Sequence, residues 1–134
     1  MYRYWYTLAV AAPKLTVRFF RTAKDNEPVR EWLKALPAAE RKAIGEEIRT
    51  VQFGWPLGMP LVRKLDVDLW EVRVRMKDRI ARVLFTIEAS EAILLHGFIK
   101  KSPKIPDEEL ATAVQRRKQL KSAAKQFAPA AKRN

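Results

Sequence analysis

The sequence predicts an α+β domain in which helices cover one face of an antiparallel sheet of about four strands. Three observations indicate this class. A period-two apolar pattern comes first, two segments with helical apolar spacing follow, and three alternating stretches separated by short turns come next. A helix-start signature follows the last of them. Consecutive strands joined by short turns form an antiparallel meander, against which the helices bury their apolar stripes.

The first strand is expected at residues 14–21, where Leu15, Val17 and Phe19 fall on one face. The first helix is expected to begin at Pro28, because a first helical turn tolerates proline. The apolar residues that follow at helical spacing are Val29, Trp32, Leu33 and Leu36.

A second helix is expected after Pro37, which interrupts the first one. Its charged outer positions leave one apolar stripe at helical spacing. The stripe consists of Ile44, Ile48, Val51 and Trp55. The stretch FGWPLGMP, which holds two glycines and two prolines, ends this helix.

The meander is expected at residues 69–76, 79–87 and 92–100, with turns at KD and EASEA between the strands. Successive side chains on a strand point to opposite faces. One face of the first meander strand is therefore apolar, and the other face carries charge. The second face holds Leu69, Glu71, Arg73 and Arg75.

The last helix is expected to start at Pro106, followed by three carboxylates at the positive end of the helix dipole. After Leu110 the chain has no acidic residue and many basic ones. We expect one domain at residues 14–121, a flexible or irregular lead at residues 1–13 and a basic, frayed tail at residues 122–134.

The composition favours polyanionic partners. The 134 residues include 27 Lys plus Arg against 15 Asp plus Glu, a formal net charge of +12. The chain has no cysteine and one histidine, which excludes disulfides, thiolate zinc sites and histidine-rich metal sites. A reducing cytoplasm fits this usage, and no segment has the ~18 apolar residues of a membrane span. We therefore expect no metal, no cofactor and no membrane partner.

The charged strand face is the first candidate site. Alternating charges such as Glu71, Arg73 and Arg75 are typical of a solvated face. However, the next strand places Arg82 among apolar residues, where an arginine needs an anionic partner or a wet cleft. If Arg73 and Arg82 share a face, their planar guanidinium groups would grip a phosphate through paired hydrogen bonds.

The stretch LLHGFIKK holds the second candidate site. By strand alternation His96, Phe98 and Lys100 point to one side, and Gly97 and Lys101 point to the other. His96 is either a partly buried histidine with one hydrogen bond or a general acid or base, since its unperturbed pKa of ~6.5 lies near working pH. The lysines either protect a strand end from aggregation or stabilise charge on a phosphate.

Other basic residues are candidates for contact with a nucleic-acid backbone, which would be independent of sequence and sensitive to salt. The alternative is a solubilising surface. These residues are Lys64, Arg75, Arg79, Lys104, Arg116 and Arg117.

The motifs LWEVR, ARVLF and LLHGFIKK, followed by a proline-acidic helix start and a basic helix, occur here in this order. Together they make the block from about residue 14 to 120 resemble the HigB-type, phage-derived branch of the RelE/ParE toxin superfamily. The resemblance implies a toxin domain at residues 14–121. Its fold would be an antiparallel sheet packed on N-terminal helices, with a C-terminal helix.

The resemblance also implies a function. Such a chain would be the toxin of a type II toxin-antitoxin pair that cleaves mRNA on the ribosome without a metal ion. Arg73 and Arg82 would hold and polarise the scissile phosphate. Lys100 and Lys101 would add charge or donate a proton, and His96 and Glu71 are the remaining candidates for proton transfer.

The resemblance further implies a cognate antitoxin with a helix-turn-helix DNA-binding domain, encoded downstream. Two alternatives stay open at this level. One is a toxin of the same superfamily that inhibits gyrase. The other is a non-catalytic module that binds RNA or the ribosome through the same basic surface.

Overall fold

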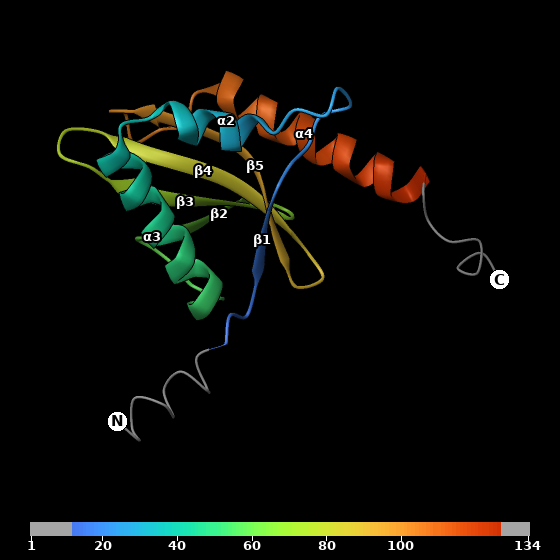
Figure 1. Ribbon diagram of the computed structural model, residues 1–134, viewed down its shortest axis with the longest axis horizontal. Coiled ribbons are helices and arrows are strands. Elements are labelled where there is room, and N and C mark those ends of the chain that lie inside the picture. The colour runs from blue at the N-terminus through green and yellow to red at the C-terminus, as the bar shows by residue number, and fades with distance from the viewer. Residues whose placement is uncertain (1–11, 127–134) are drawn as a thin grey trace.

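The computed structural model describes residues 12–126, and side chains up to residue 123 (Figure 1). Most of the predicted lead and most of the predicted tail lie outside these residues. The elements are β1 (Thr16–Phe19), α2 (Pro28–Ala35), α3 (Ala38–Gly54), β2 (Val62–Asp66), β3 (Leu69–Arg75), β4 (Ile80–Glu88), β5 (Glu91–Lys100) and α4 (Asp107–Gln126). The predicted α+β class and the order of the predicted elements are confirmed.

The sheet has five strands in the order β1-β5-β4-β3-β2. The predicted meander is β3, β4 and β5, each antiparallel to the next. The sheet differs from the prediction in two respects. It contains β2, which pairs antiparallel with β3, and its first strand pairs parallel with β5, so the sheet is mixed.

Strand β2 was not predicted because its sequence alternates poorly, with the exposed Arg63 and Lys64 adjacent to each other. The turn between β2 and β3 has a clearer sequence signal, two aspartates that favour a turn. Asp68 adopts a positive φ of 55°, and the Asp66 carboxylate accepts a hydrogen bond from the Val67 N–H at 2.7 Å. Aspartate favours both arrangements, since its short side chain bonds its own backbone and tolerates the left-handed region.

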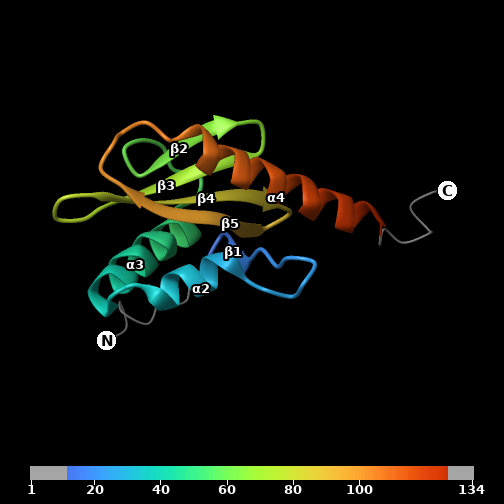
Figure 2. The same cartoon turned by 90° about the horizontal axis from the view of Figure 1, so that it is seen from above.

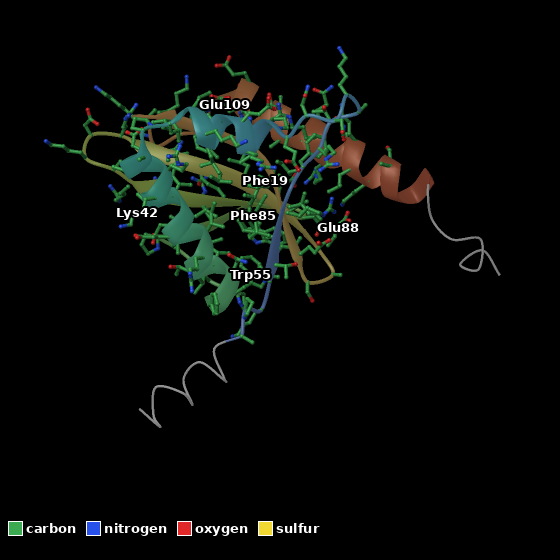
Figure 3. All side chains as sticks on the ribbon, in the orientation of Figure 1. Phe19, Lys42, Trp55, Phe85, Glu88 and Glu109 are labelled. Atoms are coloured by element: carbon green, nitrogen blue, oxygen red, sulfur yellow. The ribbon has the colours of Figure 1, made fainter. Side chains whose placement is uncertain are left out.

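Helices α2 and α3 cover one face of the sheet. The predicted stripe of α3 is buried at Ile44, Ile48 and Val51. Trp55 caps the end of α3 and packs edge-to-face on Trp70, with ring centroids 5.4 Å apart. Figure 3 labels Trp55 near the end of α3. Trp55 thus packs on the core as its place in the predicted stripe indicated, and it completes an aromatic cluster with Trp70 and Phe85.

Helix α4 covers the opposite face, as Figure 2 shows, whereas the sequence indicated helices on one face only. A second apolar cluster fills this interface. Ala113 of α4 is fully buried against it, while Leu84 and Leu95 come from the central strands. A sheet with apolar residues on both faces needs cover on both. Glu71 and Arg73 of β3 thus lie on the face that α4 covers and are mostly buried, whereas Arg75 at the strand end is exposed.

Gly97 of β5 lies directly against Trp32 of α2. A Cβ atom at this position would lie 2.4 Å from two ring atoms of Trp32. Only glycine lets the indole ring lie directly on the backbone of β5. The glycine of LLHGF therefore has a packing role, and it points away from His96 as strand alternation predicted.

Candidate nucleic-acid interface

Arg73 and Arg82 lie directly opposite each other on β3 and β4. Like charges in such a pair repel. Glu71 compensates them, because its Oε2 lies 3.4 Å from Arg82 Nε and its Oε1 lies 4.0 Å from Arg73 Nε. We call these three residues the arginine cluster.

The members of the arginine cluster differ in access to solvent. The side chain of Arg82 is 0% exposed and that of Glu71 is 1% exposed, whereas that of Arg73 is 14% exposed. Burial raises the pKa of Glu71, and the charges of Arg82 and Arg73 oppose this shift. Burial likewise lowers the pKa of Arg82. Arg73 is thus the only member of the cluster whose side chain is partly open to solvent.

The buried pair keeps unused hydrogen-bonding capacity. Arg82 Nη2 donates to the Ser102 carbonyl at 2.6 Å, which ties the loop after β5 to the sheet. Within the described residues, both carboxylate oxygens of Glu71 and the Nε and Nη1 groups of Arg82 make no hydrogen bond. Unsatisfied buried polar groups are costly, so their presence in a native structure calls for a physical reason.

The two predicted lysines lie beside the arginine cluster. Lys100 is on the same face as Phe98, the partner of Arg82, and two residues further along β5, which is roughly 7 Å. Lys101 precedes Ser102, whose carbonyl binds Arg82. Both lysines are exposed. The structure therefore groups these lysines with the arginines at one end of the sheet.

His96 belongs to a different group. Its Nε2 lies 2.7 Å from Glu109 Oε1, and its Nδ1 lies 3.3 Å from Arg116 Nη1. Because an arginine only donates, Nδ1 accepts and Nε2 carries the hydrogen that Glu109 accepts. His96 pairs with Leu84 across the sheet, one row away from the arginine pair. We call His96, Glu109 and Arg116 the histidine cluster.

The histidine cluster fastens α4 to β5. Arg116 also donates to the Leu95 carbonyl at 2.8 Å, and burial lowers the pKa of Arg116. The His96 ring stacks on Phe98 with centroids 5.6 Å apart. Both ring nitrogens are thus engaged within the protein, which favours the predicted alternative of a partly buried, hydrogen-bonded histidine.

Several of the other predicted contact residues have partners in the protein. Arg79 pairs with Glu40, and Arg117 binds the Val67 carbonyl and lies 3.9 Å from Asp66. The ammonium group of Lys64 lies over the Trp70 ring at 5.7 Å. By contrast, the exposed side chains of Arg75 and Lys104 form no ion pair with another described residue.

Three residues near these clusters were not singled out from the sequence. Arg63 is the register partner of Glu71, Ser102 anchors Arg82, and Glu109 binds His96. Arg63 was missed with its strand, although the DVD turn signals a hairpin. No local signal marks the other two, because their partners are distant in the sequence.

Potential metal ligands do not gather in the part of the chain from residue 12 to 126, where no three His, Asp or Glu side chains form a group. No helix in the same range has both the length and the apolar character to cross a bilayer.

The fold and the arginine cluster define a small, basic α+β module with a cationic strand end. The family model described as phage derived protein Gp49-like (DUF891) matches residues 31–118, more than half of the chain, so the chain belongs to this family. The family is part of the RelE/ParE-like toxin superfamily, which confirms the resemblance at that level. A comparison with curated proteins finds no match.

The match runs from within α2 to within α4 and includes every residue of the arginine and histidine clusters. The chain is thus a toxin-like, phage-derived module, and such a module implies a cognate antitoxin as its partner.

Proposed function

We propose that this chain is a HigB-type toxin of a type II toxin-antitoxin pair that cleaves mRNA on the ribosome. The observation that carries the proposal is the Arg73–Arg82 pair, held on two central strands with Lys100 and Lys101 beside it. The family is associated with RelE-like toxins, which are endoribonucleases. A net charge of +12 would draw the chain to RNA.

The proposed reaction needs no metal ion. The ribose 2′-oxygen attacks the adjacent phosphorus, so a P–O2′ bond forms while the P–O5′ bond breaks. The 2′-hydroxyl proton passes to a base, and a second proton passes from an acid to the leaving 5′-oxygen. The products are a 2′,3′-cyclic phosphate and a 5′-hydroxyl. Cations stabilise the negative charge that develops on the phosphate oxygens.

The geometry supports distinct roles for the predicted residues. Arg73, the partly exposed member of its cluster, would contact the phosphate through charge-assisted hydrogen bonds. Arg82 would act as a positioning residue, because its contacts are Glu71 and the Ser102 carbonyl.

The exposed lysine pair would supply the proton for the leaving oxygen. The alternatives for proton transfer receive less support. Both nitrogens of His96 are engaged with α4, and Glu71 is enclosed between two arginines. A proton carrier must reach the reacting atoms, and the lysines are the candidates with open access.

The antitoxin would cover this basic surface by charge complementarity. We expect an acidic segment on it, joined to a helix-turn-helix DNA-binding domain and encoded downstream. Toxin and target would meet in the cytoplasm.

The test is cleavage of a reporter mRNA by purified protein in the presence of ribosomes, read out by primer extension. Arg73→Ala should abolish cleavage. Lys42→Ala is the matched control, because Lys42 is an exposed cation on α3, on the opposite face of the sheet (Figure 3). Intact mRNA with the unmodified protein would contradict the enzyme proposal, and a supercoiling assay would then detect gyrase inhibition.

A non-catalytic RNA- or ribosome-binding module is the second candidate. The burial of Arg82 and Glu71 favours this second candidate. A wholly buried pair cannot touch RNA, so only the neighbouring exposed cations would contribute to RNA affinity. Co-sedimentation with ribosomes separates the two functions. If Arg73→Ala loses cleavage and keeps ribosome binding, the residue serves catalysis; if both are lost, it serves binding.

A further inference from the structure

A groove of about 450 Å³ runs between β2 and the loop that joins β5 to α4. This volume lies within the range of about 300–1,000 Å³ that is typical of small-ligand sites. Figure 2 shows the loop passing the β2 edge of the sheet before α4 begins. The groove is lined by Arg63, Leu65, Pro103, Lys104, Ile105, Asp107 and Leu110.

The groove combines three kinds of surface. Leu65, Ile105 and Leu110 are half-buried and pack on the apolar cluster beneath α4. Arg63 and Lys104 are exposed cations that form no ion pair with other described residues. Asp107 adds one exposed carboxylate. An apolar wall for a flat ring, flanked by cations for phosphates, complements a nucleotide of single-stranded RNA.

The groove and the arginine cluster are held by the same two elements, the β2–β3 pair and the loop after β5. Arg63 lies opposite Glu71 in the β2–β3 register. Ser102 binds Arg82 through its carbonyl, and its hydroxyl accepts a hydrogen bond from the Lys104 N–H at 3.2 Å. A single loop therefore ties the wall of the groove to Arg82, the register partner of Arg73. Since Arg63 faces Glu71, Arg63 of the groove is a diagonal neighbour of Arg73 on the adjacent strand, roughly 7–8 Å away, so a base next to a phosphate at Arg73 would lie at the groove.

We propose that this groove binds a guanine base next to the phosphate held at Arg73, with Asp107 reading the base. The inference rests on the proposed function, since it names a specificity site for the same RNA. A carboxylate only accepts hydrogen bonds. Guanine presents two adjacent donors, N1–H and the exocyclic amino group, which match its two oxygens, whereas uracil presents one N–H between two carbonyl oxygens.

The test measures binding of oligouridine pentamers that carry a single central G, A, C or U, by fluorescence anisotropy. The unmodified protein should bind the G pentamer most tightly. Asp107→Asn should reduce the preference for G over U by about tenfold, because a good bidentate contact contributes roughly that discrimination. Glu108→Gln is the matched control, because it removes a neighbouring exposed carboxylate of the same helix turn that does not line the groove.

The rim cations have a different expected signature. Lys104→Ala and Arg63→Ala should weaken binding of all four pentamers by a similar factor, and each should reduce the slope of log affinity against log salt by about one. Equal affinity of the unmodified protein for G and U, no measurable binding, or an unchanged preference in Asp107→Asn would overturn the inference.

Failure of the inference and failure of the proposed function give different results. A protein that leaves mRNA intact on the ribosome, but prefers G in a manner that depends on Asp107, retains the base site as part of a binding module. A protein that cuts mRNA without any such preference retains the proposed function and loses the base site.

Discussion

The arginine cluster and the histidine cluster lie on the same face of the same sheet, yet they have opposite properties. Each joins a carboxylate to cationic or imidazole groups. The histidine cluster uses both ring nitrogens of His96 and locks α4 in place. The arginine cluster leaves four polar groups of Glu71 and Arg82 without hydrogen bonds within the described residues and opens to solvent at Arg73. Satisfied networks rigidify a fold, whereas unsatisfied buried polar groups cost stability.

Removing Arg82 should give the largest effect. Arg82→Ala leaves the Glu71 carboxylate buried without its main partner and frees the loop at Ser102. We expect a loss of about 3–5 kcal/mol in the free energy of unfolding, measured by urea denaturation. The double variant Arg82→Met with Glu71→Leu should recover most of this loss. A single variant as stable as the unmodified protein would show that the pair is not buried in solution.

Removing His96 should have an intermediate effect on stability and none on the chemistry. His96→Ala leaves Glu109 and Arg116 of α4 without their shared partner, at an expected cost of about 1–3 kcal/mol. Cleavage of reporter mRNA per folded molecule should stay within about twofold, corrected for the folded fraction by circular dichroism. A much larger loss, with the fold intact, would move His96 into the catalytic machinery and erase the contrast between the clusters.

Removing Arg73 should have the opposite result to removing His96: a small effect on stability and a large effect on RNA cleavage. Its side chain is partly exposed and its ion pair with Glu71 is long at 4.0 Å. Arg73→Ala should therefore change the free energy of unfolding by less than about 1 kcal/mol, while RNA cleavage is lost. Arg73→Lys would sharpen the result, because it keeps the charge and removes the two-pronged donor geometry. Thermal unfolding and the cleavage assay on the same preparations would check this pair of outcomes.

The smallest effect is expected far from both clusters. Ala89 in the β4–β5 turn has a φ of 53°, a left-handed conformation that costs residues other than glycine. Ala89→Gly should raise the free energy of unfolding by up to about 1 kcal/mol and leave RNA binding unchanged. Unfolding and anisotropy measurements would test it. A change in RNA binding would mean that the conformation of this distant turn affects the position of the arginine cluster.

The parts of the fold that local periodicity encodes were predictable. The stripe at Ile44, Ile48 and Val51 and the alternation around Arg73 gave the helix and the meander. The parallel pairing of β1 was not predictable, because its partner β5 lies at the other end of the domain. The position of α4 on the second face was missed for the same reason.

The candidate site divides in a similar way. The sequence raised a shared face for Arg73 and Arg82 as a condition for a phosphate grip, and the β3–β4 register now places the two residues opposite each other. It did not predict how deeply Arg82 is buried, because burial depends on the distant Ser102 loop and on α4. The tautomer and partners of His96 likewise depend on a helix that local patterns do not place.

The parallel pairing of β1 with β5 also has a consequence for the order of folding. Thr16 pairs with Glu91, so β1 has no partner in the sheet until β5 has been synthesised. Contacts this distant in sequence slow folding, because the intervening loop must close first. The strand that ends in the lysine pair is the same strand that completes the sheet. The synthesis of β5 would therefore both complete the sheet and deliver the lysine pair at the end of this strand.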